Sequence, residues 1–483
     1  MLIPSVIAYL VVCIAIGLWA ARRVHTSKDY LVAGRSLPLY ISMATVFATW
    51  FGAETVLSVS ATFAKDGLGG IVADPFGSSF CLIFVALFFA RAFYRMDLLT
   101  IGDFYRKRYN KPVEVITGLA ITASYLGWTS AQMTALGLAF SVLSQGAVPL
   151  DTGIMLGAAI VLGYTIWGGM WSVAWTDMFQ SVVIIIGLCL VAWFVADLSG
   201  GAGTVITAAA SAGKFEFWPK GGAAEWLAFS AAWMTLALGS IPQQDVFQRV
   251  TSAKNERTAV RGTLLGGLLY FAFAFVPMFI AYSALVIDPA TGAMLVSDDA
   301  REIQRLLPRL ILERTPMWAQ VMFFGALLSA ILSTASGALL APTAICTENV
   351  LRPFLHRMGD REFLILLRSV LVTFTLAALL FALNSRSTMY EMVQNAYKVT
   401  LVGAFVPLVA GIYWKRANTA GAVMSIALGL LSWGAMELWG SGSIWPPQLV
   451  GLAFAIAGML LGSLATRAPA HAEATLHPQP HHR

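Results

Sequence analysis

Charged residues are scarce in this chain. Of its 483 residues, 12% are Asp, Glu, Lys or Arg, whereas 58% are hydrophobic. Soluble domains carry about 25% charged residues, so roughly half of the usual charge is missing. This composition excludes a disordered chain, a fibrous protein and an ordinary soluble multidomain enzyme. The 42 glycines and 19 prolines lie within apolar stretches, where lipid tolerates them better than water does.

Cysteine and histidine are also rare. The four cysteines lie in apolar segments without metal-binding or disulfide spacing, and we interpret them as small buried side chains. Four of the six histidines lie in the polar segment that ends the chain. Because no nucleophile and base have a catalytic spacing, we expect no enzyme activity and no cofactor. The net charge is +6, but the sequence contains no polar domain on which Lys and Arg could form a nucleic-acid-binding face. We therefore expect no nucleic acid as a partner.

The apolar residues form segments long enough to cross a bilayer. A helix needs about 20 apolar residues to cross the hydrocarbon core. We therefore expect an all-α integral membrane protein with about 13 transmembrane helices and the lipid bilayer as its surroundings. The expected spans are residues 3–20, 39–64, 75–94, 113–144, 150–168, 176–197, 225–242, 262–286, 318–347, 363–383, 389–413, 420–439 and 448–466.

The basic residues predict the orientation. Most of the 31 Lys and Arg residues lie in alternate loops, and the positive-inside rule assigns those loops to the cytoplasm. The N-terminus is then outside and the C-terminus inside. We expect a multi-pass plasma-membrane protein, and the absence of N-x-S/T sequons agrees with a bacterial inner membrane. The oligomeric state stays open.

Span 2 carries a charged residue near its centre. Glu54 follows Gly52 and precedes Thr55 in the run ATWFGAETVLS. A charge at this depth costs at least about 2.5–3.5 kcal/mol, so Glu54 must face a cavity or a partner. One interpretation is an unwound segment whose free carbonyls coordinate a cation. The other is a kinked helix whose glutamate bonds to a neighbouring span.

Span 9 concentrates hydroxyl groups. Ser333, Thr334 and Ser336 lie within one turn of an otherwise apolar helix. Hydroxyl and carbonyl oxygens are hard ligands that suit Na⁺. The alternative is that these hydroxyls bond to their own helix, as is common in membranes.

Further polar residues lie at bilayer depth in four other spans. These are Trp128 and Gln132 in span 4, Asp74 at the start of span 3, Asp177 in span 6, and Gln243, Gln244 and Asp245 after Pro242 in span 7. Packing alone is an alternative role for Trp128. The two broken spans, 2 and 7, lie five apart, and paired interrupted helices indicate the binding site of a secondary transporter.

This spacing predicts two five-helix repeats within six segments. The segments are a first transmembrane helix and cytoplasmic loop (1–38), a first repeat with spans 2–6 (39–197), an extracellular loop (198–224), a second repeat with spans 7–11 (225–413), two C-terminal transmembrane helices (414–466) and a cytoplasmic tail (467–483).

Several motifs resemble those of a known family, the sodium:solute symporters, which include sodium/glucose, sodium/proline, sialic acid and choline transporters. The matching segments are DYLVAGRSLP (29–38), ATWFGAE (48–54), TIGDFYRKRY (100–109), YTIWGGMWSVAWTDMFQ (164–180), GSIPQQDVFQRVTSAK (239–254) and LLSAILSTASGALLA (327–341). The resemblance extends over most of the chain and is strongest to the choline transporter branch. It implies a LeuT-type 5+5 inverted-repeat core that works by alternating access.

The resemblance also implies a sodium site. In the family, the principal site uses carbonyls of the broken first core helix together with one carbonyl and two hydroxyls of the eighth. The matching residues here are Ala48, Phe51, Ala330, Ser333 and Thr334. Some members bind a second sodium, for which Asp177, Ser333 and Ser336 match, but Gly337 stands where those members have another serine.

The substrate site follows from the same comparison. The choline branch encloses its quaternary ammonium with tryptophans, and Trp50 and Trp128 match two of these positions. A third is Gln243 here, so the aromatic box is incomplete. The expected substrate-binding residues are Trp50, Glu54, Thr55, Asp74, Trp128, Gln132, Gln243 and Gln244.

We therefore expect a sodium-coupled symporter that imports a small organic solute, favouring a cationic or zwitterionic amine, amino acid or choline- or betaine-like compound. One alternative is a proton-coupled transporter of a carboxylate or sugar that uses Glu54 or Asp74. Another is a non-transporting solute sensor on the same scaffold. The short C-terminal tail argues against the sensor, because it has no room for a signalling domain.

Overall fold

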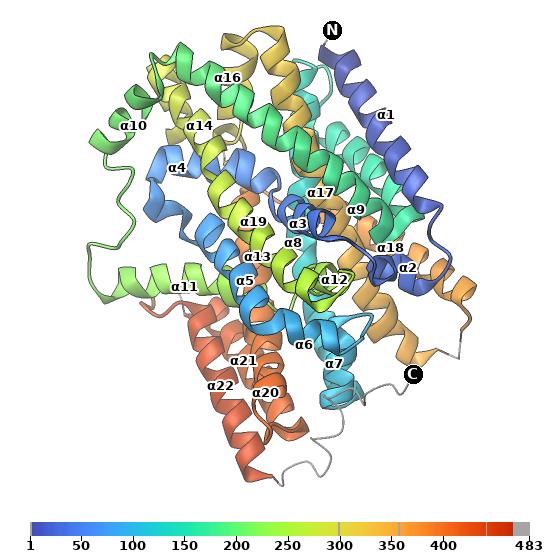
Figure 1. The fold of residues 1–483 in the computed structure, drawn as a ribbon. Coiled ribbons are helices and arrows are strands. Elements are labelled where there is room, and N and C mark those ends of the chain that lie inside the picture. The colour runs from blue at the N-terminus through green and yellow to red at the C-terminus, as the bar shows by residue number, and fades with distance from the viewer. Residues whose placement is uncertain (1, 298–299, 356–357, 441, 467–483) are drawn as a thin grey trace.

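The computed structural model describes residues 2–297, 300–355, 358–440 and 442–466. The side chains of three residues within these ranges (164, 300 and 301) are not described. The predicted cytoplasmic tail, residues 467–483, lies outside the described residues. Within them the chain is entirely helical apart from loops and one isolated bridge, between Leu37 and Ala253 (Figure 1).

The first half of the chain contains fourteen helical elements. They are α1 (Leu2–Ala21), α2 (Ser27–Val32), η1 (Ala33–Arg35), α3 (Leu39–Trp50), η2 (Glu54–Val59), α4 (Ser60–Asp66), η3 (Leu68–Ile71), η4 (Val72–Gly77), α5 (Ser78–Phe84), η5 (Val85–Phe89), α6 (Ala90–Arg95), α7 (Ile101–Arg108), α8 (Lys111–Leu143) and α9 (Leu150–Leu198).

The second half continues in the same way. Its elements are α10 (Ala202–Ser211), α11 (Ala223–Gly239), α12 (Gln244–Thr251), α13 (Glu256–Phe273), α14 (Phe275–Ile287), η6 (Pro289–Val296), α15 (Ala300–Ile303), α16 (Leu306–Arg314), α17 (Met317–Ile345), η7 (Cys346–Leu351), η8 (Arg352–Phe354), α18 (Asp360–Asn384), α19 (Met389–Thr400), η9 (Leu401–Phe405), α20 (Val406–Tyr413), α21 (Thr419–Trp439) and α22 (Pro447–Ala465).

The expected all-helical membrane fold is confirmed, whereas the count of 13 spans is not. Nine described helices are long and apolar enough to span a membrane, or up to 11 if each bent pair is one span. The remaining two expected spans correspond to α8 and to the first part of α9. Polar side chains lower the hydropathy of α8, and the apolar part of α9 is short, from Leu150 to Gly163.

Two of the spans are broken, as the sequence predicts. The helix pair Leu39–Trp50 and Glu54–Asp66 bends by 56°, and the pair Ala223–Gly239 and Gln244–Thr251 bends by 44°. Helix α9 also changes direction, at Gly169, whose φ of 48° favours glycine. A Cβ atom at Gly169 would overlap the backbone and ring of Tyr30, so the close approach of α2 requires a glycine here.

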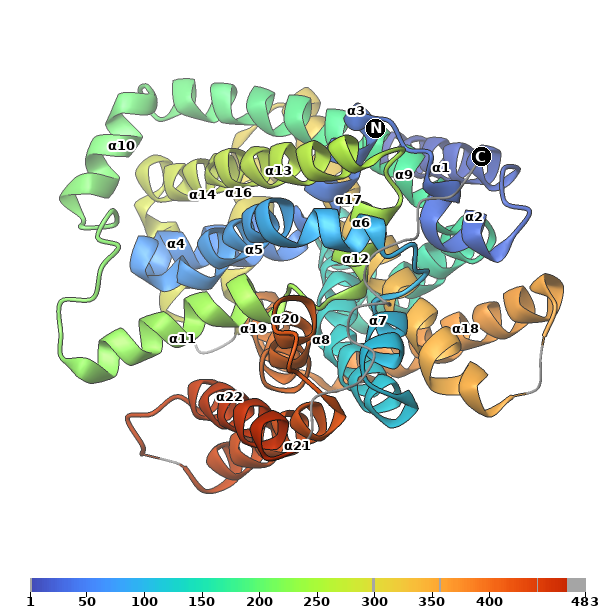
Figure 2. The same ribbon diagram turned by 60° about the horizontal axis from the view of Figure 1, so that its bottom comes forward.

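Helix α17 forms the centre of the bundle. Every residue from Ala326 to Ile345 is buried, which is the pattern of a helix surrounded by others on all faces. By contrast, α1 lies at one edge, and α21 and α22 pack against each other as a separate pair (Figure 2). The oxygen atoms of span 9 therefore face protein and not lipid.

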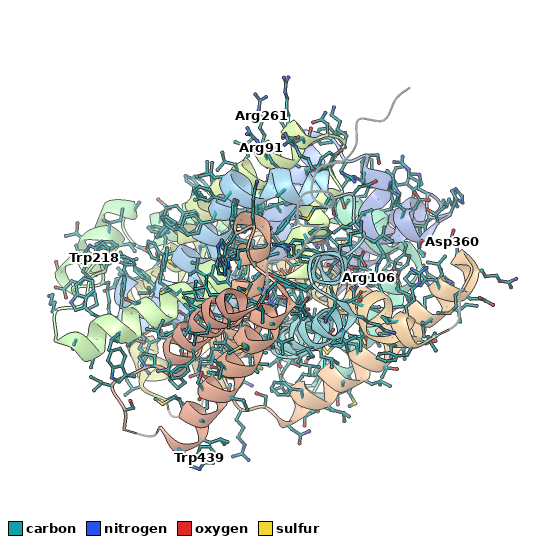
Figure 3. The ribbon with its side chains drawn as sticks, turned by 90° about the horizontal axis from the view of Figure 1, so that it is seen from below. Arg91, Arg106, Trp218, Arg261, Asp360 and Trp439 are labelled. Atoms are coloured by element: carbon teal, nitrogen blue, oxygen red, sulfur yellow. The ribbon has the colours of Figure 1, made fainter. Side chains whose placement is uncertain are left out.

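The predicted cytoplasmic loops gather at one end of the bundle, which we call the basic end. Arg95 bonds to Glu256 with an Nε–Oε2 distance of 2.8 Å, and Ser27 donates to Asp360 at 3.0 Å. Asp360 and Trp218, on the connection from α10 to α11, lie at opposite ends of the molecule (Figure 3). Alternate loops thus share one end, as an alternating topology requires.

Candidate functional site

The break after α3 frees a main-chain oxygen inside the bundle. In a continuous helix the N–H of Gly52 would bond to the carbonyl of Ala48. Here it donates instead to the carbonyl of Trp50 at 3.1 Å. The next N–H, of Ala53, donates to the side-chain oxygen of Gln132 on α8 at 3.2 Å. The carbonyl of Ala48 is therefore available to another partner.

Helix α17 supplies that partner. Ser333 donates to the carbonyl of Ala48 at 2.8 Å and lies 3.0 Å from the carbonyl of Ala330 on its own helix. The hydroxyl of Thr334 lies 3.3 Å from the same Ala48 carbonyl. Four of the five expected sodium ligands are thus brought together, and the hydroxyl of Ser333 contacts both helices. The fifth, Phe51, is the residue that follows α3, with φ −85° and ψ 75°.

This arrangement of oxygens requires a glycine in the break. An added Cβ at Gly52 would lie 2.9 Å from the hydroxyl of Thr334 and would overlap the carboxylate of Glu54. A Cβ atom essentially never comes this close to another heavy atom, so a side chain here would displace the Thr334 hydroxyl and the Glu54 carboxylate. Gly52 therefore leaves the space that these two side chains occupy at the break.

The buried carboxylate of Glu54 bonds to α8. Glu54 is only 4% exposed. It accepts a hydrogen bond from the indole N–H of Trp128 at 3.0 Å and one from the amide of Gln132 at 2.5 Å. Both features expected for span 2 therefore occur together: the helix is interrupted, and its glutamate bonds to a neighbouring span.

Three buried aromatic rings lie beside this carboxylate, and we call them the aromatic trio: Trp50, Trp128 and Tyr397. The ring centroids of Trp50 and Trp128 are 6.2 Å apart, and that of Tyr397 is 6.4 Å from Trp50 and 6.1 Å from Trp128. Tyr397 was not among the substrate-binding residues expected from the sequence. Its signal was the unusually polar run YEMVQNAYKVT within an expected span.

Asp74 belongs to a second polar group. It is 3% exposed and precedes Pro75 through a cis peptide bond. Its carboxylate accepts hydrogen bonds from the hydroxyl of Tyr270 on α13 and from that of Thr55, the latter at 3.3 Å. Thr55 and Tyr270 are themselves 3.1 Å apart. This group joins spans 2, 3 and 8 next to Glu54.

The two glutamines after the second break point in different directions. The amide of Gln243 donates to Ser124 at 2.9 Å and to Thr400 at 3.2 Å, so it faces α8 and α19. The side chain of Gln244 instead accepts from the N–H of Ile101 on α7 at 2.8 Å, toward the basic end. The structure thus brings Gln243, but not Gln244, to the side of the break where α8 and α19 pack.

The residues expected at a second sodium position have other partners. Asp177 accepts from Thr45 at 2.5 Å, and the hydroxyl of Ser336 donates to the carbonyl of Ser333 at 2.9 Å. A Cβ at Gly337 would lie 2.5 Å from the Nη2 atom of Arg249. The guanidinium therefore occupies the space that a serine side chain would take.

Arg249 is a charge buried between the two broken spans, and the sequence analysis did not select it. It is 2% exposed and donates to Thr49 at 2.9 Å and to the carbonyl of Asp245 at 3.3 Å. The carboxylates of Asp177 and Asp245 are buried as well. Among the described residues, one oxygen of each carboxylate and the Nη2 atom of Arg249 have no hydrogen-bond partner.

Acidic groups outnumber basic ones among the buried residues of the site. Carboxyl groups of Glu54, Asp74, Asp177 and Asp245 are buried around the two breaks, together with the single guanidinium of Arg249. Buried charges of one sign are costly unless an opposite charge joins them. Neutral oxygen atoms near net negative charge suit a small hard cation, and aromatic rings beside a carboxylate suit an organic one.

Comparison with known proteins agrees with this geometry. The model of the sodium:solute symporter family matches residues 30–429. The chain is 26% identical over 463 residues to the high-affinity choline transporter 1 of Caenorhabditis elegans, covering 89% of this chain and 76% of that protein. It is 24% identical over 446 residues to the sodium/glucose cotransporter of Vibrio parahaemolyticus, covering 86% of this chain and 81% of that protein.

A solved structure shares the fold. A Na⁺-coupled sialic acid symporter in a substrate-bound outward-open state superposes with a TM-score of 0.80 at 18% identity, covering 96% of this chain and 98% of that one. At this identity the likeness concerns the fold, which is the LeuT-type arrangement that the family resemblance implies.

Proposed function

Because this chain belongs to the sodium:solute symporter family, we propose that it is a sodium-coupled secondary active symporter that imports a small organic solute by alternating access. The observation that carries the proposal is the contact of Ser333 and Thr334 with the Ala48 carbonyl at 2.8 and 3.3 Å. A cation at this point would bind both the interrupted helix and α17, and so would hold them together.

The proposed sodium ligands are the carbonyls of Ala48, Phe51 and Ala330 and the hydroxyls of Ser333 and Thr334. We assign one sodium ion per cycle. The side chain of Arg249 lies where a second cation would need ligands, and a fixed positive charge repels a mobile one. Asp177 and Asp245 then supply negative charge to an ion whose direct ligands are all neutral.

We propose an organic ammonium compound as the solute. A quaternary or primary ammonium group is attracted to aromatic faces by about 0.5–2 kcal/mol per ring. The aromatic trio provides three such rings, and Glu54 provides a carboxylate within hydrogen-bond reach of Trp128. Tyr397 adds a third ring to the two tryptophans of the expected aromatic box. Gln243 lies on the side of the second break where α8 and α19 pack.

We further propose that the basic end faces the cytoplasm, which places the N-terminus outside and the C-terminus inside. The gathering of the Lys- and Arg-rich loops at this end supports the assignment. The ends of α4 and α10 and the start of α19 then face the outside of a plasma membrane. The absence of N-x-S/T sequons agrees with a bacterial inner membrane.

Sodium coupling provides enough energy for accumulation. One charge gains about 2.3 kcal/mol per 100 mV, and a tenfold sodium gradient adds about 1.4 kcal/mol. Together these support an accumulation of a neutral solute by about 500-fold under such conditions. Coupling requires that sodium and solute each favour the conformation that binds the other. In this proposal both contact the broken helix α3–η2, so both favour the same conformation of that helix.

The test begins with a thermal-shift screen of the purified protein against amines, amino acids, sugars and carboxylates, with sodium or potassium chloride. We expect an amine to stabilise the protein only with sodium. Uptake of that amine into proteoliposomes then compares the Ser333→Ala/Thr334→Ala double variant with Thr343→Ala. Thr343 is a buried threonine of the same helix that bonds to the carbonyl of Leu339 at 2.7 Å.

The double variant should lose sodium-driven uptake, whereas Thr343→Ala should retain it. Undiminished uptake by the double variant would overturn the sodium site. Uptake driven by a pH gradient without sodium would instead favour proton coupling, for which the buried Glu54 and Asp74 are the candidate groups. A solute that binds without being accumulated would indicate a sensor.

A further inference from the structure

Three tryptophan rings lie around one arginine where α1 and α9 pack at the basic end. The two helices lie side by side at one edge of the molecule (Figure 1 and Figure 2). Arg23 lies two residues beyond the end of α1, and its Cζ atom is 5.0 Å from the ring centroid of Trp19. The same atom is 5.0 Å from the centroid of Trp171 and 5.4 Å from that of Trp175, one turn apart on α9. We call these four residues the arginine–tryptophan cluster.

The rings hold the guanidinium at the protein surface. Trp19 is 47% exposed, and its ring meets that of Trp175 edge to face, with centroids 5.3 Å apart and an interplanar angle of 82°. A guanidinium is attracted to aromatic faces and keeps its capacity to donate, because its N–H groups lie around its edge. Arg23 is therefore held in place while its donors stay available.

The bonding capacity of this cluster is not used within the chain. Among the described residues, the side chain of Arg23 forms no ion pair and no hydrogen bond. The indole nitrogens of Trp171 and Trp175 are buried and also have no hydrogen-bond partner in that part of the chain. All of these groups are donors, so the partner that suits them is an acceptor with negative charge. An acceptor can reach the indoles only if a ring moves, so the first contact falls to the exposed Arg23.

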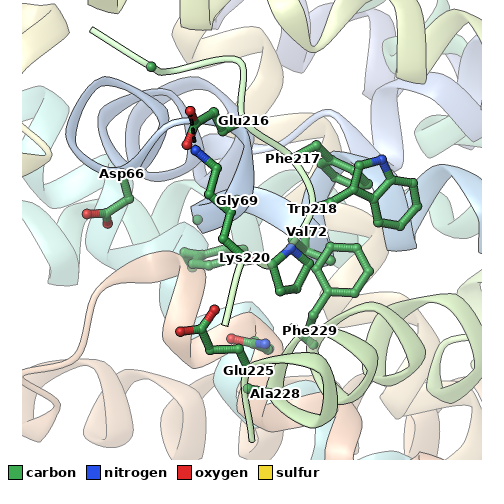
Figure 4. Close-up of a pocket in the computed structure, with 16 residues that line it drawn as sticks. Asp66, Gly69, Val72, Glu216, Phe217, Trp218, Lys220, Glu225, Ala228 and Phe229 are labelled. Carbon is green, nitrogen blue, oxygen red and sulfur yellow. Dashed lines mark ion pairs between the residues drawn. The ribbon is translucent and has the colours of Figure 1, made fainter. Parts of the chain in front are cut away.

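The difference in charge between the two ends of the molecule favours an anion at this cluster. Arg22 is exposed beside Arg23, and its side chain likewise forms no ion pair within the described ranges. At the opposite end, a cavity of about 580 Å³ has a lining with net negative charge (Figure 4). The charged residues of that lining are Asp66, Glu216, Glu225 and Lys220. An anion is therefore attracted to the basic end and repelled at the other.

The cluster also lies at the boundary of an apolar surface. Helix α1 is apolar along its length and ends at Ala21, directly before the two arginines. On this helix Ile7, Val11 and Leu18 are exposed, and in a membrane these side chains contact acyl chains. Tryptophan and arginine at the end of a span are typical of the membrane–water interface. A ligand bound here therefore has access both to the guanidinium and to the apolar surface of α1.

We propose that the arginine–tryptophan cluster binds the phosphate group of an anionic phospholipid from the leaflet at the basic end. The phosphate oxygens accept hydrogen bonds from the guanidinium of Arg23, and the acyl chains lie along the exposed face of α1. Free phosphate offers the same oxygens but has no acyl chains, so it gains only the first of these contacts. The site needs neither sodium nor an organic solute and is independent of the proposed symport.

Native mass spectrometry of the full-length protein in a neutral maltoside detergent counts the bound lipids directly. The probes are dioleoylphosphatidylglycerol, whose headgroup is anionic, and dioleoylphosphatidylcholine, which has the same acyl chains and a zwitterionic headgroup. We expect the first phosphatidylglycerol to bind about tenfold more tightly than the first phosphatidylcholine. Potassium phosphate, compared with potassium chloride at equal ionic strength, should not displace it.

Two variants locate the site. Arg23→Gln should weaken the first binding step of phosphatidylglycerol about fivefold, as expected for the loss of one basic residue near the lipid surface. The weaker later steps should not change, which shows that the variant is folded. Arg261→Gln is the matched control, at an exposed arginine of α13 that lies over no tryptophan ring among the described residues. It should leave every binding step unchanged.

The lipid site would be overturned by equal affinity for the two lipids, or by equal affinity in Arg23→Gln and the wild type. An equal loss in Arg261→Gln would show diffuse attraction to the basic end and would overturn the site as well. Displacement of the lipid by low-millimolar phosphate, with chloride ineffective, would assign the cluster to a free anion in place of the lipid. Sodium-driven uptake is measured separately, so these outcomes are distinct from failure of the proposed function.

Discussion

The hydroxyl of Ser333 donates to the carbonyl of Ala48 at 2.8 Å, although the two residues are 285 positions apart in the chain. The bond exists because the helix that contains Ala48 is interrupted four residues later, which removes the usual partner of that carbonyl. An interrupted helix and a hydroxyl-bearing helix together create a set of oxygens that neither could form alone.

Gly52→Ala should weaken sodium binding. The added Cβ would lie 2.9 Å from the Thr334 hydroxyl, so this proposed sodium ligand must be displaced. Overpacking of this kind costs about 1–3 kcal/mol, and we expect the apparent sodium affinity to fall about tenfold. Sodium-dependent thermal stabilisation, with potassium chloride to hold ionic strength constant, measures this change.

Gly163→Ala is the matched control, since a Cβ at this helical glycine would meet nothing within 4 Å. Equal sodium titrations for both alanine variants would contradict the role of Gly52.

Tyr397→Leu should reduce affinity for an organic cation, whereas Tyr397→Phe should not. The ring of Tyr397 lies nearly parallel to that of Trp50, with an interplanar angle of 8°, and leucine removes its attraction for a cation. The expected loss is about 1–2 kcal/mol, or about five- to thirtyfold in affinity. Competition by a series of amines, measured by thermal shift, would show it. A similar loss in the phenylalanine variant would instead assign the effect to the hydroxyl.

Glu54→Gln tests the role of the buried carboxylate. Glutamine keeps the size and its single carbonyl oxygen can still accept one of the two hydrogen bonds, from Trp128 or Gln132, but it removes the charge. We expect weaker binding of cationic amines, by about tenfold or more, with the sodium dependence of uptake retained. If uptake in the wild type follows a pH gradient and this dependence disappears in Glu54→Gln, then Glu54 carries a proton and sodium coupling through the neutral oxygens is wrong.

Arg249→Met should destabilise the protein more than the double variant Asp177→Asn/Arg249→Met. Removing the guanidinium leaves the carboxylates of Asp177 and Asp245 without a buried cation, which costs about 3–5 kcal/mol. Removing Asp177 as well reduces the unbalanced negative charge, so part of the loss should be recovered. Thermal unfolding in detergent measures both variants. Arg261→Met, at an exposed arginine of α13, is the control and should have little effect.

One sodium ion per cycle predicts a Hill coefficient near 1. The Nη2 atom of Arg249 lies 2.5 Å from the position of a Cβ at Gly337, and we propose that it takes the place of a ligand side chain for a second ion. Sodium titrations of thermal stability, repeated at a saturating amine concentration, give this coefficient. A value near 2 would place a second ion beside Asp177 and would contradict the assignment.

Much of the fold followed from composition and spacing. The scarcity of charge indicated a helical membrane protein, and the positions of Gly52 and Pro242 indicated the two broken spans, with bends of 56° and 44°. These are local properties, because a helix breaks where its own residues cannot continue its hydrogen bonds. The expected number of spans was not confirmed. The polar side chains of α8 lower its hydropathy, so this helix does not meet the criterion for an apolar span.

The sequence did not predict which residues each buried polar side chain contacts. The sequence indicated that Glu54 needs a partner, but not that Trp128 and Gln132 supply it. Tyr397 and Arg249 escaped selection because a tyrosine in a span and an arginine after a helix break are common features. Gln243 and Gln244 are adjacent in the chain, yet the helix that begins between them directs their side chains to opposite sides.

By itself, the sequence determined the medium, the helical fold and the places where two helices break, because hydropathy and main-chain geometry act on neighbouring residues. The family followed from the resemblance of its motifs. Only the tertiary structure decided which oxygens meet at the break, which rings form the aromatic trio and where the guanidinium of Arg249 lies. Those contacts join residues dozens to hundreds of positions apart, and their distances depend on how the helices pack.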